Sequence, residues 1–355
     1  MAVVAREGVP LSFVTAEFAP RLIDWQRSQG RHSLPWQNTR DPYRVWLSEI
    51  MLQQTQVATV LGYYARFLAR FPDVRSLAAA PLDDVLTLWQ GLGYYSRARN
   101  LHRCAQAVVE RHGGEFPPSS GALAELPGIG RSTAAAIAAF CFGERVAILD
   151  GNVKRVLTRV LGFDADLAQA ANERALWAHA TRLLPPTGIE PYTQGLMDLG
   201  ATLCSTRSPS CLLCPVGELC VARQLGEPER FPVKSRKLVR SLRENWWLWL
   251  EWKGQVWLVQ RPDSGVWAGL WTLPLFDDEA GLLAAAARLG SETQPLPTIR
   301  HVLTHFDWIL HPRRLKLAAA PIGLGPGRWV PREALHDIAL PSPLKKLLDS
   351  AAAPA

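Results

Sequence analysis

Four cysteines crowded into one short stretch constrain the fold of this chain more than any other feature of its sequence. They are separated by six, two and five residues, and they are Cys204, Cys211, Cys214 and Cys220. Thiolates this close together in sequence can surround one metal centre. Tetrahedral zinc and a four-iron cluster both take four cysteines, so the spacing leaves either metal open. We predict a metal-binding loop at residues 204–220 whose metal supports the structure rather than the reaction.

The other two cysteines, Cys104 and Cys141, stand alone in apolar helical patterns. This distribution is typical of a reducing compartment and not of a disulfide framework. Residues 1–20 lack the features of a signal peptide, and no stretch approaches the ~18 consecutive apolar residues of a membrane span. We expect a cytoplasmic protein, associated with the nucleoid if it is bacterial, with no membrane partner. No oligomerisation surface is evident, so we expect a monomer.

The balance of charge favours a polyanionic partner. Lysine and arginine number 39 against 32 aspartate and glutamate residues, which gives a net charge of +7. A surplus of this kind indicates nucleic acid first among the possible partners. A mildly basic protein with no such partner is the alternative that charge alone leaves open.

The chain before residue 240 has the hydrophobic periodicity of short helices. Asp41-Pro42 is a start signal, because an N-cap carboxylate precedes proline at the first helical position. Apolar stripes at helical spacing predict further helices at residues 55–71, 81–89 and 96–112. No strand alternation of any length occurs here, so residues 1–225 are predicted to form an all-helical domain.

Residues 226–243 break this pattern with two prolines and a run of basic side chains. The basic residues are Arg230, Lys234, Arg236, Lys237, Arg240 and Arg243. Proline and charge in this mixture are typical of a connection between domains. We predict an interdomain linker with a cationic face; a solvated linker without a partner is the alternative.

After the linker the pattern changes to short strands. Residues 246–252 and 255–259 flank Lys253-Gly254, a hairpin-type turn. The remaining expected elements are a helix at 278–289 and strands around 298–310 and 314–318. We predict a second, α+β domain at residues 244–349.

A glycine-containing hairpin lies within residues 123–140. Leu126-Pro127-Gly128-Ile129-Gly130 precedes an alanine-rich helix. Gly128 and Gly130 allow a tight turn that presents backbone N–H groups beside a helix N-terminus, an arrangement that holds a phosphate oxygen. Helix-hairpin-helix units of this type bind the DNA backbone without reading sequence. The alternative is an ordinary turn between two helices.

Two carboxylates are candidates for catalysis. Asp150 precedes a helix, where an N-cap role is the alternative. Glu49 lies beside the apolar stripe of the helix after Asp41, where desolvation raises the pKa of a carboxyl and can keep it protonated. A protonated acid beside an ionised carboxylate is the pair that cleaves glycosidic bonds. We therefore predict Glu49 and Asp150 as that pair.

Two polar loops fall at predicted helix ends. They are Gln53-Gln54-Thr55 and the glycine-flanked stretch from Gly91 to Tyr95. Amides and an aromatic ring on such loops can fill the gap left in DNA when a base is turned out. Ordinary helix-terminal polarity with a core tyrosine is the alternative for each loop.

Taken together, these motifs resemble the adenine DNA glycosylase (MutY) family of the helix-hairpin-helix, endonuclease III-like superfamily. The matching stretches are Leu34 to Trp36, Tyr43 to Val57, Gly91 to Tyr95, Leu126 to Thr133, Ile148 to Val156 and the four-cysteine loop. The resemblance covers residues 20–225 strongly and 245–345 more weakly. It implies an all-α helix-hairpin-helix glycosylase domain followed by an α+β Nudix-like domain that recognises 8-oxoguanine.

The resemblance also implies an activity and a cofactor. The expected enzyme is a base-excision-repair glycosylase that hydrolyses the N-glycosidic bond of adenine mispaired with 8-oxoguanine or guanine. Its substrate would be double-stranded DNA from which the adenine is flipped out. The family's cluster is [4Fe–4S], so the resemblance assigns the four cysteines to that cofactor.

Carried over by position, the family's roles fall on residues of this chain. Glu49 would protonate adenine N7, Asp150 would stabilise the oxocarbenium-like sugar, and Asn152 would support Asp150. The residues implied beside the DNA are Gln53, Gln54, Thr55, Leu92 and the wedge Tyr94. The residues implied along the adenine pocket are Leu34, Trp36 and Gln194.

The residue at position 132 distinguishes the adenine DNA glycosylase family from its bifunctional, endonuclease III-like relatives. Those enzymes carry a lysine after the hairpin, which forms a Schiff base and nicks the strand, whereas this chain has Ser132. A hydroxyl cannot perform that step, so we expect a monofunctional glycosylase. Lys154 is placed with the DNA-binding residues and has no required catalytic role.

The second domain resembles the family's 8-oxoguanine reader. The acidic cluster that would bind magnesium for pyrophosphate hydrolysis is missing after Gly269. We therefore expect this domain to bind and not to hydrolyse. The family's Phe-Ser-His motif aligns with Leu303-Thr304-His305, where Thr304 keeps a hydroxyl but the aromatic is lost. We expect a modestly lower preference for 8-oxoguanine over guanine.

Two rival functions are distinguishable. A thymine or oxidised-pyrimidine glycosylase on the same scaffold would not need an acid for adenine N7, which the presence of Glu49 argues against. A non-catalytic DNA-binding or redox-sensing iron–sulfur protein would not need both Glu49 and Asp150.

Overall fold

A computed structural model describes residues 11–235, 239–290, 292–319, 321 and 323–350 of the 355-residue chain. Of the basic residues predicted in the linker, Arg236 and Lys237 lie outside the described residues. No helix in the described ranges is long and apolar enough to cross a membrane.

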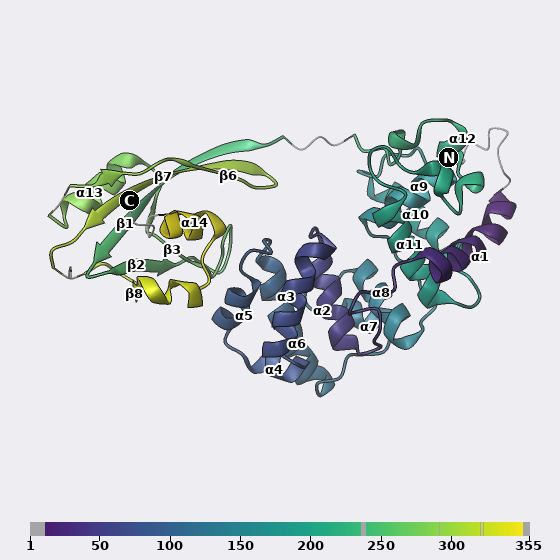
Figure 1. Cartoon of the computed structure of the whole chain (residues 1–355), viewed down its shortest axis with the longest axis horizontal. Coiled ribbons are helices and arrows are strands. Elements are labelled where there is room, and N and C mark those ends of the chain that lie inside the picture. Colours follow the sequence, from purple (N-terminus) through teal and green to yellow (C-terminus); the bar gives the residue numbers. More distant parts are fainter. Residues whose placement is uncertain (1–10, 236–238, 291, 320, 322, 351–355) are drawn as a thin grey trace. The chain divides into compact units, whose positions relative to one another are not determined.

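The part of the chain before residue 240 is helical where it is described (Figure 1). Its helices are α1 (Leu11–Gln29), α2 (Pro42–Leu52), α3 (Val57–Arg70), α4 (Val74–Ala79), α5 (Leu82–Trp89), α6 (Ser96–His112), α7 (Ser120–Ala124), α8 (Arg131–Phe142), α9 (Gly151–Leu161), α10 (Ala170–Arg182), α11 (Ile189–Thr202) and α12 (Val221–Gln224). Short 3₁₀ turns follow as η1 (Cys211–Leu213), η2 (Gly217–Leu219) and η3 (Pro228–Arg230). The predicted helices are confirmed, and the Asp41 side chain caps α2 by accepting from Tyr43 N at 2.9 Å.

The later part is a mixed sheet with helices. Its elements are β1 (Ser241–Trp252), β2 (Gln255–Gln260), β3 (Trp271–Thr272), β4 (Leu275–Phe276), α13 (Glu279–Ala287), β5 (Gln294–Pro295), β6 (Ile299–Val302), β7 (Phe306–Lys316), β8 (Arg328–Pro331), η4 (Arg332–Asp337) and α14 (Ser342–Ser350). The main path of the sheet runs β3-β2-β1-β7-β5. Outside this path, β4 pairs with β1, β6 pairs with β7, and β8 pairs with β2. The α+β class predicted for this part is confirmed.

Central strand β1 is buried on both faces, which explains its tryptophan-rich apolar run. Residues 247–250 are all buried. On one face Leu248 and Leu250 pack with Leu282 of α13. On the other, Trp247 stacks on Trp267 with ring centroids 5.8 Å apart. A strand covered on both sides shows no alternation, as in this segment.

Two predictions about the strands were wrong. The predicted strand at 298–310 is interrupted at 303–305, so that β6 and β7 pair antiparallel across a turn. The predicted strand at 314–318 is the continuation of β7, which runs parallel to β1 from Ser241↔Phe306 to Glu251↔Lys316. This pairing also makes residues 241–243 part of a strand, although the sequence predicted linker there. Parallel partners are far apart in sequence, and periodicity within one segment does not reveal them.

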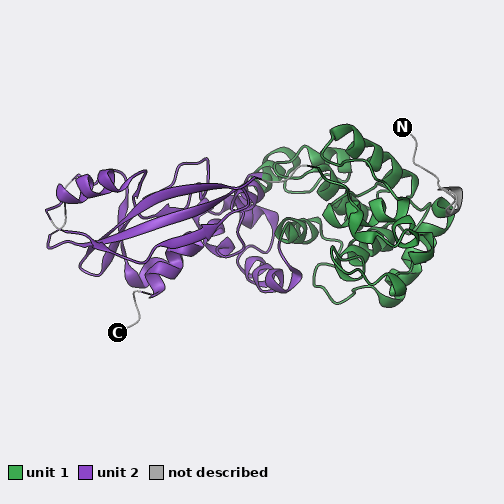
Figure 2. Ribbon diagram, turned by 90° about the horizontal axis from the view of Figure 1, so that it is seen from above, with its two compact units in different colours: residues 1–54, 104–237 green, residues 55–103, 238–355 purple. Residues whose placement is uncertain are grey.

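Contacts divide the chain into two compact units, which cut across the sequence order (Figure 2). Unit 1 comprises residues 1–54 and 104–237, and unit 2 comprises residues 55–103 and 238–355. Helices α3 to α5 therefore group with the sheet. The domain limits predicted at 1–225 and 244–349 stay a prediction, because compactness and family boundaries are different criteria.

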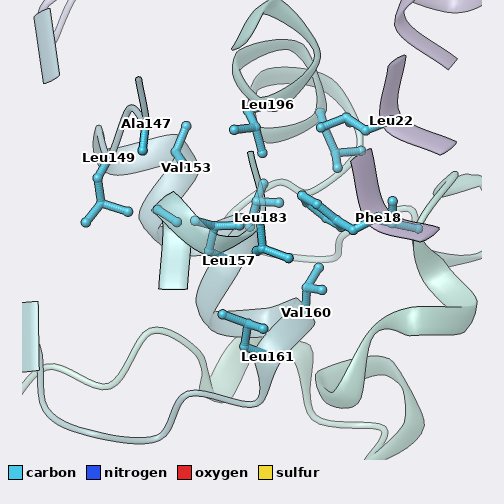
Figure 3. Packing of buried hydrophobic residues seen from close by; sticks show 14 of the residues in the cluster. Phe18, Leu22, Ala147, Leu149, Val153, Leu157, Val160, Leu161, Leu183 and Leu196 are labelled. Carbon is cyan, nitrogen blue, oxygen red and sulfur yellow. The ribbon is translucent and has the colours of Figure 1, made fainter. Parts of the chain in front are cut away.

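The core of unit 1 is built around α9 (Figure 3). Val153, Leu157 and Val160 lie on the buried face of α9 and pack with side chains of α1 and α11. The N-terminal end of α9 is approached closely by α11, because a Cβ on Gly200 would lie 2.6 Å from Asn152 Cβ. This packing fixes the position of the helix that Asp150 precedes.

Candidate functional site

Asp150 is the N-cap of α9. Its Oδ1 accepts a hydrogen bond from Val153 N at 2.7 Å, and its backbone is extended. Burial raises the pKa of the Asp150 carboxyl, while the N–H groups of Val153 and Asn152 act in the opposite direction. The N-cap reading of the sequence is therefore correct. It does not conflict with a role in a cleft, because a carboxylate has two oxygens and Asp150 keeps partial exposure.

Glu49 lies on α2 within the electrostatic reach of Asp150. Desolvation raises the pKa of Glu49 to about 8, and the negative charge of Asp150 adds to the effect. Glu49 nevertheless keeps part of its surface open to solvent. A carboxyl group with this pKa is mostly protonated at pH 7 and can give its proton to a ligand that reaches it.

The scaffold around the two carboxylates is well packed. Trp46 of α2 is fully buried against Phe116, with ring centroids 5.2 Å apart. Ser132 of α8 accepts a hydrogen bond at its Oγ from Leu149 N at 3.0 Å. Because Leu149 directly precedes Asp150, Ser132 holds the segment that presents the carboxylate.

Asn152 is held by an arginine that the sequence analysis did not single out. Arg155 Nη2 donates to Asn152 Oδ1 at 2.9 Å and to Gly200 O at 2.6 Å, and Arg155 Nε donates to Cys204 O at 2.7 Å. One guanidinium thus ties together the start of α9, the end of α11 and the cysteine loop. Its signal in the sequence was only a basic residue on a predicted helix. The support of Asp150 by Asn152 stays a prediction.

The residues predicted along the adenine pocket lie on two segments of unit 1. Trp36 is buried and Leu34 half-buried in the loop before α2. Gln194 of α11 donates from Nε2 to Asp198 Oδ1 at 2.9 Å. Asp198 is fully buried and paired with Arg31, whose Nε lies 2.6 Å from Oδ1. Asp198 was missed, although a charged residue in an apolar helical stripe is a recognisable signal.

The hairpin has the backbone that its glycines predict. Gly128 has φ +78°, which is left-handed, and Gly130 is the N-cap of α8. Leu126 and Ile129 are buried and anchor the turn, while Gly128 and Gly130 are exposed. The N-terminus of α8 is therefore open to an anion.

The residues predicted beside the DNA lie on turns, two of them with unusual backbone. Gln54 and Tyr94 are non-glycine residues with φ +56° and +49°, and both are exposed. Gln53 follows α2 as its C-cap, and Leu92 is buried. Left-handed backbone at a non-glycine residue is uncommon and often marks functional turns.

Arg97 organises the turn that carries Tyr94, and the sequence analysis missed it. Its Nη2 donates to Thr55 Oγ1 at 3.1 Å, to Leu92 O at 3.2 Å and to Gly93 O at 3.3 Å. Its guanidinium carbon lies 5.5 Å from the centre of the Tyr94 ring. Burial lowers the pKa of Arg97 to about 10, which leaves it charged at neutral pH.

Within unit 2, Tyr94 contacts one of the residues that align with the family's Phe-Ser-His motif. Its hydroxyl lies 3.1 Å from Thr304 Oγ1, although 210 residues separate the two. Thr304 and His305 are exposed on the turn between β6 and β7. We call residues Leu303–His305 the reading loop.

Lys154 is engaged in an ion pair. Its Nζ lies 2.6 Å from Glu173 Oε1 of α10, and the lysine is about a quarter exposed (24%). The placement of Lys154 with the DNA-binding residues stays a prediction.

The four cysteines of the predicted loop line one pocket. Arg159, Arg223, Ser210 and apolar residues complete its wall. Arg159 is buried, and its Nη1 lies 3.3 Å from Cys204 Sγ. Among the described residues, no three metal-ligating side chains converge closely enough to hold a single ion. Four cysteine thiols are a ligand set that suits either zinc or a four-iron cluster.

Comparisons with known proteins find matches to both parts of the chain. Residues 47–180 match the HhH-GPD superfamily base excision DNA repair proteins, and residues 245–350 match the NUDIX domain. An adenine DNA glycosylase of Buchnera aphidicola subsp. Schizaphis graminum is 32% identical over 94% of this chain and 98% of its own. The adenine DNA glycosylase of Homo sapiens is 35% identical over 94% of this chain and 73% of its own.

Similarity in structure points to the same scaffold. A solved structure of a thermostable thymine-DNA glycosylase has a TM-score of 0.54 and 28% sequence identity. The match covers 59% of this chain and 97% of that chain.

Proposed function

Because this chain belongs to the adenine DNA glycosylase family of base excision repair enzymes, we propose that it excises adenine placed opposite 8-oxoguanine or guanine in double-stranded DNA. The observation that carries the proposal is the pairing of Glu49 with Asp150. In this pair the pKa of Glu49 is raised to about 8. A pair of carboxyl groups with separated roles is what glycosidic cleavage requires.

Glu49 supplies the proton. Adenine is a poor leaving group as an anion, and protonation at N7 lets it depart as a neutral base. The raised pKa keeps Glu49 protonated at neutral pH, and a positioned acid of this kind is typically worth ~10²–10⁴ in rate. After departure of the base, the Glu49 carboxylate can accept a proton from water.

Asp150 faces the sugar. Positive charge develops on the sugar as the glycosidic bond breaks, and an ionised carboxylate stabilises it. Burial raises the pKa of Asp150, and the hydrogen bond from Val153 N opposes that shift by favouring the ionised form. Asn152, fixed by Arg155, keeps the start of α9 in place beside it.

The remaining predicted residues bind the flipped-out DNA. Gly128 and Gly130 would receive a phosphate at the open N-terminus of α8. The adenine pocket is assigned to Leu34, Trp36 and Gln194. At the base opposite the adenine, Thr55 and Leu92 would line the gap, with Tyr94 as the wedge. Gln53 and Gln54 stay assigned to DNA binding.

The Nudix-like part would read 8-oxoguanine without hydrolysing nucleotides. The acidic metal-binding cluster of hydrolases is absent from its sequence after Gly269. Thr304 offers a hydroxyl to the base, but Leu303 replaces an aromatic residue of the family motif. We therefore propose that its preference for 8-oxoguanine over guanine is modestly lower than it would be with the aromatic residue.

The four-cysteine pocket would hold a [4Fe–4S] cluster. Its ligands would be Cys204, Cys211, Cys214 and Cys220. When bound, such a cluster cross-links the loop, and Arg159 would donate a hydrogen bond to one of its ligand sulfurs.

Because residue 132 is a serine, we propose that the enzyme is monofunctional and does not cut the DNA strand. Its hydroxyl accepts a backbone hydrogen bond and cannot form a Schiff base. We further propose a monomer that acts on chromosomal DNA in the cytoplasm.

Single-turnover assays on three duplexes test the proposal. They carry adenine opposite 8-oxoguanine, adenine opposite guanine, and thymine opposite guanine. Free adenine should appear from the first two, fastest from the first, with strand cleavage only after added base. Release of thymine would favour the pyrimidine rival, and tight binding without release would favour a non-catalytic protein.

A further inference from the structure

Arg240 belongs to the basic segment 226–243, yet its side chain turns onto the reading loop of unit 2. Arg240 Nη2 donates to Leu303 O at 2.9 Å and forms an ion pair with Asp307. The next residue, Ser241, donates from its backbone N to His305 O at 3.3 Å. Residues 240 and 241 therefore hold the carbonyl groups at both ends of the reading loop.

The reading loop needs such an anchor. One backbone hydrogen bond closes it, from Leu303 N to O of Phe306, the residue that follows the loop, at 3.0 Å. Thr304 and His305 project into solvent between β6 and β7. A short exposed turn of this kind samples several conformations unless other groups tie it down.

The charge of Arg240 is already partly neutralised. Asp307, whose side chain is 14% exposed, pairs with both Arg240 and Arg300. Two arginines that share one carboxylate hold it from two sides, and a planar guanidinium suits two simultaneous acceptors. A cation held in this way is less available to DNA phosphates than a free linker arginine.

We propose that Arg240 is a positioning residue for base discrimination: it fixes the reading loop so that Thr304 stands beside Tyr94. The proposal rests on the proposed function and deepens it. The 3.1 Å contact between the hydroxyls of Tyr94 and Thr304 is the geometry that this anchor maintains. The basic segment thus contributes to specificity and not only to affinity.

Salt dependence separates this role from a phosphate contact. An arginine that neutralises a phosphate contributes about one unit to the slope of log affinity against log salt, whatever the bases are. A positioning residue changes the ratio of affinities for two bases and leaves that slope unchanged. The two roles therefore predict opposite patterns.

Duplex affinities measured over a series of KCl concentrations make the test. The background is Glu49→Gln, so that adenine is retained opposite either 8-oxoguanine or guanine. Arg240→Met is compared with Arg230→Met as the control. Arg230 is a linker arginine whose side chain is 54% exposed and paired with Glu227. Among the hydrogen bonds of the described residues, none joins Arg230 to the reading loop. Arg240→Lys retains the charge but lacks the planar fork.

Arg240→Met should lower the preference for 8-oxoguanine about fivefold or more, the effect of one lost charge-assisted hydrogen bond. Its affinity for the guanine duplex and its salt slope should stay as they were, and Arg240→Lys should be intermediate. Arg230→Met should keep the preference. Hydrogen exchange of the Leu303 and Ser241 amides, which donate hydrogen bonds to Phe306 O and His305 O, should accelerate only in the Arg240 variants.

An equal loss of affinity for both duplexes with a smaller salt slope would overturn the proposal, because Arg240 would then be a phosphate contact. An unchanged preference in both Arg240 variants would overturn it as well. Failure of the proposed function looks different, since the protein with Arg240 intact would then show no preference for 8-oxoguanine or no adenine release.

Discussion

The carboxyl group of Glu49 is desolvated, which disfavours its ionised form and keeps it protonated at neutral pH. Its pKa of about 8 means that ionising it within the fold costs free energy that the unfolded chain does not pay. The sequence predicted this from a glutamate on an apolar flank. The role of Asp150 was harder to predict from the sequence, because an N-cap role and a catalytic role were alternatives for the same residue. The structure shows that the cap is real and that the two roles are compatible.

Replacing Glu49 should reveal this cost in stability. The carboxyl group has a folded-state pKa of about 8 against an ordinary value of 4.5, so the folded state binds the proton more tightly. The free energy of unfolding of the native protein should therefore fall as pH rises from about 4.5 to about 8. Glu49→Gln should remove this loss, and its Tm should exceed that of the native protein at pH 8.5 but not at pH 4.5. Equal Tm differences at both pH values would contradict the assigned pKa.

Arg97 and the contact between Tyr94 and Thr304 could not be predicted from sequence. Arg97 lies on a helix that looks like any other basic helix, and its role depends on three acceptors brought together by folding. Tyr94 and Thr304 were predicted separately as DNA-side residues. That they touch each other follows only from tertiary structure.

A double-mutant cycle tests whether Tyr94 and Thr304 act together. Tyr94→Phe and Thr304→Val should each reduce the preference for 8-oxoguanine over guanine. The double variant should lose less than the sum, with a coupling of about 0.5–1.5 kcal/mol, because one hydrogen bond is removed in each case. Thr304→Ser keeps the hydroxyl and is the control. Strictly additive losses in duplex affinity would show that the contact carries no function.

At the scale of elements, helices were predicted better than strands. Helical periodicity is a local property, so α3, α5 and α6 were found near their observed limits. The short strands β3, β4, β5 and β8 were missed, because two to four residues give no periodic signal. The turn between β6 and β7, where the reading loop lies, and the parallel pairing of β7 with β1 were not predicted either.

The contact between α11 and the start of α9 offers a test of how the elements position the site. Gly200→Ala would place a Cβ 2.6 Å from Asn152 Cβ, so α11 or α9 must shift. Overpacking of this kind costs typically about 1–3 kcal/mol, and the displacement should also slow adenine release. Gly121→Ala is the matched control, since its Cβ would meet nothing within 4 Å. Urea unfolding and single-turnover rates measure both effects, and a Gly200→Ala protein that behaves like the control would contradict the close packing.

At the scale of the whole molecule, the sequence predicted two domain types and their order. It did not predict that helices α3 to α5 group with the sheet in one compact unit. That grouping depends on contacts between segments more than a hundred residues apart, which no local pattern encodes. The turn that carries Tyr94 and the reading loop, which we propose contact the base opposite the adenine, both belong to unit 2. Glu49 and Asp150 both belong to unit 1.

The cysteine pocket makes a prediction for the intact protein. Purified protein should contain about four iron atoms per chain and show the absorbance of an iron–sulfur cluster. Cys214→Ser should lower the iron content and the Tm, because a loop cross-link is lost, whereas Cys104→Ser should leave the iron content unchanged. One zinc ion per chain in place of iron would overturn the assignment.

The pH dependence of adenine release tests the central claim most directly. Single-turnover rate constants would be measured from pH 5.5 to 9.5 on a duplex with adenine opposite 8-oxoguanine. If Glu49 acts as the acid, the rate should be highest below its pKa of about 8 and fall about tenfold per pH unit above it. A rate that stays level or rises across pH 8 would contradict the account, because Glu49 would then act in its ionised form or not at all.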